Sequence, residues 1–253
     1  MLRRPSPAWL LVLVLMGCKH IPTDQERELA VIHYDLALQA QLAGALPDSY
    51  KELEKALALD PDYPEAHNAM ALLLHMAFKK PEQAIEHYKK ALEVRPGFSE
   101  AKTNLANVYL DQTHYDEAIK LYEEVLNDML YPTPYIAQGN LGWALYKKGE
   151  KERGVESIKA AVTTNPRFCM GYRNLGLIHD EQGEVSEACD YFAHYREACP
   201  QVADAYIRMR EGVCQVKLGQ VEEARQSFTF CEAKARESDT KLKKDCRKLL
   251  EAL

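Results

Sequence analysis

Cysteine is the residue type with the clearest capacity for covalent chemistry in this chain. The sequence contains seven cysteines, of which Cys18 lies near the N-terminus and the other six lie in the C-terminal third. An even set of six cysteines in an exported chain predicts a disulfide framework, although the sequence alone leaves several connectivities open. The same six residues could instead be free, buried thiols.

Helix hairpins narrow the choice of partners, because residues at equal distances from a turn face each other. The turns expected near residues 183, 200 and 238 place three pairs of cysteines opposite one another: Cys169–Cys199, Cys189–Cys214 and Cys231–Cys246. Neighbouring helix axes are often about 8–10 Å apart, whereas a disulfide needs Cα atoms within about 7 Å. The three pairings are therefore hypotheses, with free buried cysteines as the alternative.

Other residues do not assemble into a catalytic or metal-binding motif. The sequence lacks C-x-x-C, H-E-x-x-H, G-x-S-x-G, G-x-G-x-x-G and a phosphate loop. His67 and His75 have no carboxylate in a ligand motif, and nothing orients His194 as a base toward Cys199. We therefore expect no catalytic residue, no metal and no cofactor.

The first 18 residues have the pattern of an export signal. Arg3 and Arg4 precede a short apolar run over residues 9–16, which is well below the roughly 20 residues of a membrane-spanning helix. The segment that ends at Cys18, Leu-Met-Gly-Cys, resembles a bacterial lipobox, with methionine as a mild departure. We interpret residues 1–17 as a lipoprotein signal peptide and Cys18 as the lipidation site. The alternatives are an ordinary signal peptide and a fortuitous hydrophobic start.

A lipobox cysteine implies a membrane anchor. In such lipoproteins the cysteine carries a diacylglyceryl thioether and commonly a third acyl chain on its amine, and two or more chains anchor a protein stably. Lys19 follows, rather than the aspartate that retains many Gram-negative lipoproteins in the inner membrane. We therefore expect a location at the outer membrane, facing the periplasm. Residues 18–27 would be a tether that reaches about 30 Å when extended.

Composition favours a helical protein with an ample core. Hydrophobic residues make up 47% of the chain, glycine and proline are limited to 12 each, and helix-forming Ala, Leu, Glu and Lys are frequent. The formal net charge is −6 and no basic cluster is evident. A chain with this charge is a poor candidate for binding nucleic acid.

The sequence repeats itself with a period near 34 residues. Residues 139–143, Gly-Asn-Leu-Gly-Trp, recur as residues 173–177, Arg-Asn-Leu-Gly-Leu, and Pro166 recurs as Pro200. These residues resemble the tetratricopeptide repeat. That pattern places Leu-Gly or Leu-Ala in the first helix of a pair, Ala and an aromatic residue in the second, and a proline at the end.

This resemblance implies an all-α, right-handed superhelix of about six helix-turn-helix repeats. Within a solenoid over residues 28–237, we expect repeats at about 30–61, 63–96, 98–130, 135–166, 169–200 and 202–237. A last helix over residues 240–253 has an apolar stripe and a lysine-rich opposite face. We interpret it as the half-polar cap that repeat arrays need at their ends, with membrane binding through its basic face as the alternative.

The first helices of tetratricopeptide pairs line a concave surface, where binding residues would lie. Asn104, Asn140 and Asn174 each precede the Leu-Gly or Leu-Ala pair, the place at which peptide-binding members bond the ligand backbone. An amide suits this task because it donates and accepts at once. Aromatic and Arg side chains are typical of binding hot spots. We expect the groove to be completed by nearby residues: Asn107, Trp143, Tyr146, Lys147, Met170, Arg173 and Leu177.

Two alternatives to a binding role remain for these residues. Each Asn could simply be tolerated on a solvated helix face, and Trp143 could pack between helices instead of facing a ligand.

A lipobox, a short tether and about six such repeats together resemble the pilotin lipoproteins of type IV pilus systems, the PilF/PilW/Tgl kind. The cysteine-rich C-terminal half is most similar to the Tgl branch. The resemblance implies a scaffold that binds PilQ-type secretin subunits and promotes their multimerisation and insertion in the outer membrane. Pilus assembly and twitching-type motility would depend on it. It implies no enzymatic activity, small-molecule substrate or nucleic acid. The alternative is another periplasmic repeat scaffold, such as a lipoprotein that regulates a cell-wall or other envelope enzyme.

Overall fold

A computed structural model describes residues 21–253, which form thirteen α-helices and, over that range, no β-strand. The predicted signal peptide over residues 1–17 and the predicted lipidation site Cys18 lie outside the described residues. None of the helices between residues 21 and 253 combines the length and the apolar character needed to cross a bilayer.

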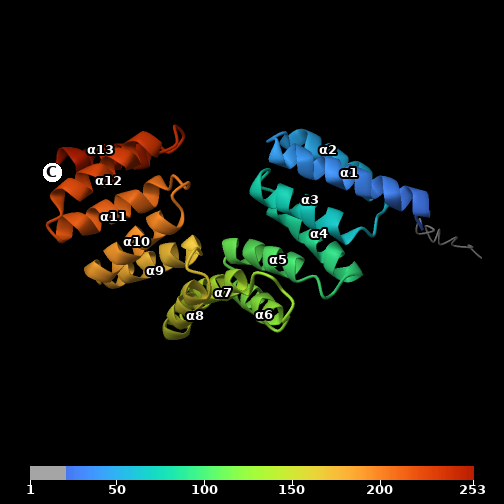
Figure 1. The fold of residues 1–253 in the computed structure, drawn as a ribbon, viewed down its shortest axis with the longest axis horizontal. Helices are drawn as coiled ribbons and strands as arrows, with labels where there is room; N and C mark the ends of the chain where they lie inside the picture. The colour runs from blue at the N-terminus through green and yellow to red at the C-terminus, as the bar shows by residue number, and fades with distance from the viewer. Residues whose placement is uncertain (1–20) are drawn as a thin grey trace, which may run out of the picture.

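The first twelve helices form six successive pairs, each packed within itself, and the last helix packs on the sixth pair (Figure 1). The predicted all-α array of helix pairs with a C-terminal capping helix is thereby confirmed. The pairs are α1 (Asp24–Leu42) with α2 (Leu46–Leu59), α3 (Pro64–Met76) with α4 (Pro81–Val94), α5 (Ser99–Asp111) with α6 (Tyr115–Leu126), α7 (Pro134–Lys148) with α8 (Lys151–Thr164), α9 (Cys169–Gln182) with α10 (Val185–Ala198), and α11 (Ala205–Lys217) with α12 (Val221–Lys234); the capping helix is α13 (Thr240–Glu251).

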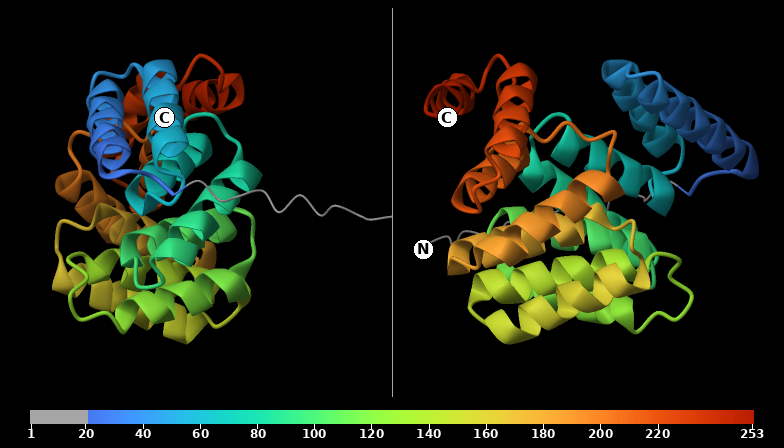
Figure 2. Two further views of the ribbon diagram at one scale, coloured as in Figure 1. Left: turned by 90° about the vertical axis from the view of Figure 1, so that its right-hand side faces the viewer. Right: turned by 60° about the vertical axis from the view of Figure 1, so that its left-hand side comes forward.

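The array bends along its length. Figure 1 shows the pairs along an arc whose two ends, α1–α2 and α12–α13, lie on the same side, with α6–α8 at the opposite side. Figure 2 shows the same arrangement from two further directions. The first helices of successive pairs touch directly, as α3 with α5, α5 with α7 and α7 with α9. These first helices therefore share one continuous surface.

The tether is shorter than predicted, because α1 begins at Asp24, inside the segment 18–27. Thr23 is the cause. Its hydroxyl accepts a hydrogen bond from the Glu26 amide at 3.2 Å, and the Glu26 carboxylate accepts one from the Thr23 amide at 2.7 Å. This reciprocal capping box satisfies two backbone donors that a helix start leaves open. Only residues 19–23 separate Cys18 from the helix in the sequence.

Each helix pair closes where a small residue of the first helix meets a large side chain of the second. A Cβ added at Gly176 would lie 2.5 Å from the Phe192 ring, and one added at Gly212 would lie 2.5 Å from the Phe228 ring. Both rings are fully buried. The Leu-Gly and Leu-Ala signatures thus mark the point of closest helix approach, where a larger residue would push the pair apart.

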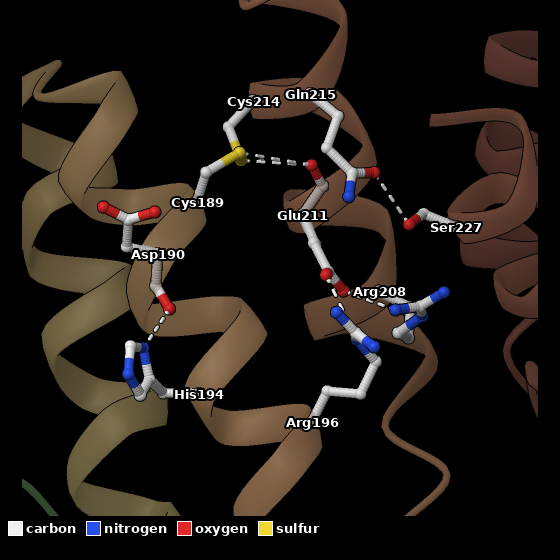
Figure 3. Close-up of polar contacts among 9 residues, drawn as sticks. All are labelled: Cys189, Asp190, His194, Arg196, Arg208, Glu211, Cys214, Gln215 and Ser227. Carbon is white, nitrogen blue, oxygen red and sulfur yellow. Dashed lines mark hydrogen bonds and ion pairs between the residues drawn. A yellow bond between two sulfur atoms is a disulfide. The ribbon is translucent and has the colours of Figure 1, made fainter. Parts of the chain in front are cut away.

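The sixth pair departs from this pattern at Glu211, which occupies the core position that Leu175 fills in the fifth pair. The Glu211 side chain is buried, and its carboxylate accepts from Arg208 Nη1 at 2.6 Å and from Arg196 Nε at 3.3 Å (Figure 3). A carboxylate is tolerated in a core only when it is paired and hydrogen-bonded. The two arginines allow α11 to pack here despite the lost leucine.

Three disulfides tie the C-terminal helices together, and they join the same pairs that hairpin symmetry proposed. The Cα atoms are 5.8 Å apart in Cys169–Cys199, 5.8 Å in Cys189–Cys214 and 6.0 Å in Cys231–Cys246. The bridges link α9 to the end of α10, α10 to α11, and α12 to α13. Helices α1–α8 contain no cysteine and are held by packing, hydrogen bonds and ion pairs, without a disulfide.

The disulfide at Cys199 also decides the role of its neighbour His194. The Cys199 sulfur is bonded to Cys169, so there is no free thiol that His194 could deprotonate. The His194 Nδ1 donates to the Asp190 carbonyl at 2.7 Å, and its ring stacks on Tyr172.

Removing the Cys189–Cys214 bridge should loosen the junction between the fifth and sixth pairs. The bridge spans 25 residues, and a loop of that size corresponds to about 3.5 kcal/mol of stabilisation through the unfolded chain. A Cys189→Ala, Cys214→Ala variant should therefore exchange amide hydrogens faster in α10 and α11, measured by hydrogen–deuterium exchange, with α3–α6 as the internal control. Exchange in α10 and α11 that is as slow in the variant as in the wild type would contradict this prediction. Six alkylatable thiols in the wild-type protein would contradict the disulfides themselves.

Candidate binding groove

A groove of about 620 Å³ runs along the inner surface of the array from α3 to α9. Its walls are mostly the first helices of the second to fifth pairs. Eight of the ten residues predicted for the groove line it: Asn104, Asn107, Asn140, Trp143, Lys147, Met170, Arg173 and Asn174. The structure therefore brings these residues of three separate repeats to one surface.

Two predicted residues lie elsewhere. Tyr146 is buried, and its hydroxyl donates to Glu181 Oε2 at 2.8 Å; burial and this hydrogen bond raise its pKa to about 12. Leu177 packs into the apolar cluster formed with α10 and α11. Both residues lie within one helical turn of a groove residue, yet their side chains pack within the array and do not line the groove.

Sequence reasoning missed the part of the groove that α3, the end of α5 and the start of α6 provide. The additional lining residues include Leu72, His75, Met76, Leu110, Asp111 and Tyr115. Helical spacing carried a signal for two of them, because Leu110 and Asp111 follow Asn107 by one turn and share its face. The second pair gave no such signal, since no Asn precedes its Met70-Ala71 signature.

The groove asparagines connect neighbouring repeats. Asn104 Nδ2 donates to Asn68 Oδ1 at 3.1 Å, and Asn140 Nδ2 donates to Asn107 Oδ1 at 2.8 Å. The predicted row of three equivalent amides is therefore partly occupied within the protein. Asn174 is buried in the groove wall, and its amide has no hydrogen-bond partner among the residues that the structure describes. Each of the bonded amides still has capacity for a further bond.

Asn107 also secures the core behind the groove. The fully buried Tyr122 donates its hydroxyl to Asn107 Oδ1 at 2.6 Å, and burial raises the Tyr122 pKa well above its usual value. One acceptor thus serves a core tyrosine and the Asn140 amide together. Asn107 is a positioning residue for the groove wall.

The charged groups of the groove are mostly paired within the protein. Arg173 Nε donates to Asp204 Oδ2 at 3.2 Å, and His75 Nε2 lies 2.9 Å from Asp111 Oδ2. Lys147 instead places its ammonium 5.1 Å from the centre of the Trp143 ring. Over the described part of the chain it has no carboxylate partner, so it is the cation best placed to meet a ligand carboxylate.

The apolar residues of the groove are adaptable. Met76 and Met170 are exposed, and methionine adjusts readily to partners of different shape. Trp143 is half-buried in the wall and stacks on Tyr146, with ring centroids 6.0 Å apart. The tryptophan thus faces the groove while its ring is held in place from behind.

One hydroxyl in the groove wall is unusual. The Tyr88 side chain is buried, and its hydroxyl has no hydrogen-bond partner among residues 21–253. Burial raises its pKa well above the normal range. A ligand group that reached this hydroxyl would relieve the cost of an unsatisfied polar atom.

This geometry defines a protein-binding repeat scaffold. The groove presents amides, aromatic rings and methionines, and nowhere in residues 21–253 do three or more His, Cys, Asp or Glu residues gather in a way that could hold a metal ion. Two tetratricopeptide-repeat profiles match the chain, one over residues 75–130 and one over residues 103–167 and 140–203.

A relative narrows the class further. The chain is 30% identical over 169 residues to the type IV pilus assembly protein PilF of Pseudomonas aeruginosa, an alignment that covers 64% of this chain and 67% of that protein. The chain belongs to the tetratricopeptide-repeat family and is related to the PilF/PilW type IV pilus biogenesis factors. Its fold is that of a tetratricopeptide-repeat scaffold.

Two solved structures show the same fold. The structure of Pseudomonas aeruginosa PilF superposes with a TM-score of 0.71 at 18% identity, covering 88% of this chain and 98% of that one. The crystal structure of PilW, described as a widely conserved type IV pilus biogenesis factor, gives 0.73 at 22% identity, covering 89% and 98%. The predicted tetratricopeptide-repeat superhelix is confirmed.

The double role of Asn107 generates a stability test. An Asn107→Ala variant leaves the buried Tyr122 hydroxyl without an acceptor and should lose about 1–3 kcal/mol. Adding Tyr122→Phe removes the stranded hydroxyl and should recover part of this loss. Urea unfolding of the single and double variants measures both effects. Equal stability of wild type and the Asn107→Ala variant would show that this hydrogen bond does not matter.

Proposed function

We propose that the protein is a lipid-anchored periplasmic scaffold, a pilotin. It binds secretin subunits of the PilQ type and promotes their multimerisation and insertion in the outer membrane. The observation that carries this proposal is the groove from α3 to α9, in a chain whose relatives act in type IV pilus assembly. The homology supports a role in pilus assembly, and the groove offers a surface through which a subunit could be held.

The groove suits a segment of protein better than a small molecule. Its lining alternates side-chain amides with aromatic and thioether groups along successive helices. Such a surface accommodates an extended strand or an amphipathic helix, whose apolar side chains meet Trp143 and Met170 while its polar groups reach Asn174. Lys147 would favour a segment with an acidic residue at that end.

The predicted lipid at Cys18 would provide the second half of the mechanism. A scaffold confined to the membrane surface meets secretin subunits where the ring must assemble, and confinement raises their effective concentration. The step needs binding and release only. The bond-making chemistry of the chain would be limited to its own disulfides and its own lipidation.

Removing the aromatic anchor of the groove should weaken secretin binding. A Trp143→Ala, Asn174→Ala variant loses the half-buried ring that faces the groove and an amide that makes no internal hydrogen bond. We therefore expect at least a roughly 30-fold weaker Kd, the range of a hot-spot residue. Pull-down of PilQ-type secretin and interferometry measure this. Lys120→Ala, on the outer helix α6, is the matched control. Unchanged binding in the groove variant would locate the interface elsewhere.

The anchor generates a separate prediction. A Cys18→Ala variant should accumulate as a folded protein that still binds secretin, while heat-resistant secretin oligomers at the outer membrane fall sharply because the scaffold is no longer confined there. Immunoblotting of unboiled envelope fractions, at matched protein levels, measures the oligomers. Full oligomer yield from the unlipidated protein would overturn the role of the anchor. Normal oligomers with altered cell-wall synthesis in a deletion strain would support the envelope-enzyme regulator instead.

A further inference from the structure

Helix α1 carries an apolar stripe that is open to solvent. Leu29, Ile32 and Leu36 are 39%, 52% and 44% exposed. Their spacing of three and four residues places them on one face of the helix. The stripe lies apart from the groove, whose walls begin at α3.

Two of the three stripe residues, Ile32 and Leu36, occupy positions that every later repeat buries. Ile32 lies five residues before Ala37, the small residue of its helix pair. The residues at the same place in the second, third, fourth and sixth pairs are at most 1% exposed: Ala66, Ala101, Ala137 and Ile207. Leu36 lies one residue before Ala37, where Met70, Leu105, Leu141 and Leu175 are at most 7% exposed. In those pairs the preceding pair covers the face. Helix α1 is the first helix of the described residues, and no described helix pair packs on this side of it (Figures 1 and 2).

The two ends of the array therefore differ. The C-terminal end is closed by α13, which is joined to α12 by Cys231–Cys246. The N-terminal end presents aliphatic side chains where a cap with a polar outer face would be expected. Something outside the described chain should cover them.

A second copy of the chain is a poor occupant. A standard protein interface buries about 800 Å² on each partner, far more than three half-exposed aliphatic side chains supply. In a two-fold pair the same surface patch meets itself. The acidic residues along one flank of the stripe, Glu28 and Asp35, would then approach their own copies.

We propose that this stripe rests in the headgroup–acyl boundary of the membrane that holds the lipid anchor. The proposal rests on the lipidation of Cys18. Residues 19–23 can separate the lipid from α1 by at most about 20 Å, so the helix starts at the membrane. Ile21, which is 79% exposed, adds an apolar side chain between the lipid and the stripe.

The acyl chains would supply the affinity, and the stripe would supply the orientation. A tethered surface needs little additional contact, because its effective concentration at the membrane is already high. Helices that lie in the membrane interface bury their apolar face only about 5–10 Å deep, which three aliphatic side chains can achieve. Contact along α1 would fix the first repeat on the bilayer and point the later repeats, with the groove, into the periplasm.

The charge beside the stripe sharpens the prediction. Glu28 and Asp35 are exposed and acidic, and they would lie close to the headgroups. Anionic lipid should repel them, particularly at low salt. Docking should therefore be stronger on zwitterionic vesicles than on vesicles rich in phosphatidylglycerol.

The test uses the lipidated protein in phosphatidylethanolamine–phosphatidylcholine vesicles with brominated acyl chains. In a Trp143→Phe background, the Ile32→Trp variant reports the depth of the stripe, and the Met129→Trp variant, at a 97% exposed loop position between α6 and α7, is the matched control. We expect bromine to quench the tryptophan at position 32 at least twofold and to leave the control unchanged. Replacing the zwitterionic lipid with phosphatidylglycerol should reduce the quenching.

Several results would overturn the proposal, and each is distinguishable. Absence of quenching, with lipidated Cys18 verified by mass spectrometry, would reject docking through α1 and leave the anchor standing. An unmodified Cys18 in the native protein would reject both the docking of α1 and the lipid anchor. Dimerisation of the unlipidated chain that an Ile32→Gln, Leu36→Gln variant abolishes would assign the stripe to a second copy. Protection of α1 that appears only when secretin is added would assign it to that partner.

Discussion

No helix pair in this protein can bury its apolar surface alone, and the rest of the structure depends on this constraint. Each pair covers one face against its predecessor and one against its successor. Small residues such as Gly176 bring the two helices of a pair together, and leucines such as Leu175 fill the contact with the preceding pair. The continuous row of first helices, and hence the groove, follows from this stacking. The open face of α1 follows as well, because among residues 21–253 no helix pair comes before the first one.

The disulfides divide the array into two mechanical parts. From α9 to α13 three bridges supplement the stacking; one lies within the fifth pair, and the other two join the sixth pair to its neighbours. There a paired carboxylate, Glu211, replaces the core leucine. A buried ion pair contributes less reliably to stability than the apolar packing it replaces. Covalent cross-links therefore occur where the packing of the repeat is weakest.

Much of the fold could be predicted from the sequence, whereas less of the groove could be. The period near 34 residues identified the helix pairs, and symmetry about the turns gave the cysteine partners. Asn104, Asn140 and Asn174 were found because they share a register. Their hydrogen bonds were not foreseeable, because Asn68 and Asn107 occupy different register positions and meet them only through the bend between repeats. Tyr146 and Leu177 were misplaced for a related reason: spacing along a helix does not say which neighbours surround each face. The start of α1 was missed although Thr23 and Glu26 form a recognisable capping box.

The groove crosses the boundary between the two mechanical parts. Arg173 and Asn174 stand on α9, the first cross-linked helix, and Arg173 is further tied to Asp204 ahead of α11. Leu72 and Met76 stand on α3, which packing and hydrogen bonds hold without a disulfide. The groove thus has one end that disulfides hold rigid, at α9, and one end that can move, at α3. Small changes of curvature spread over α3–α8 can adjust the width of the groove to the segment it binds, while the cross-linked helices keep a constant shape. Oxidation of the six cysteines would then determine the stiffness of this end of the groove as well as the stability of the fold.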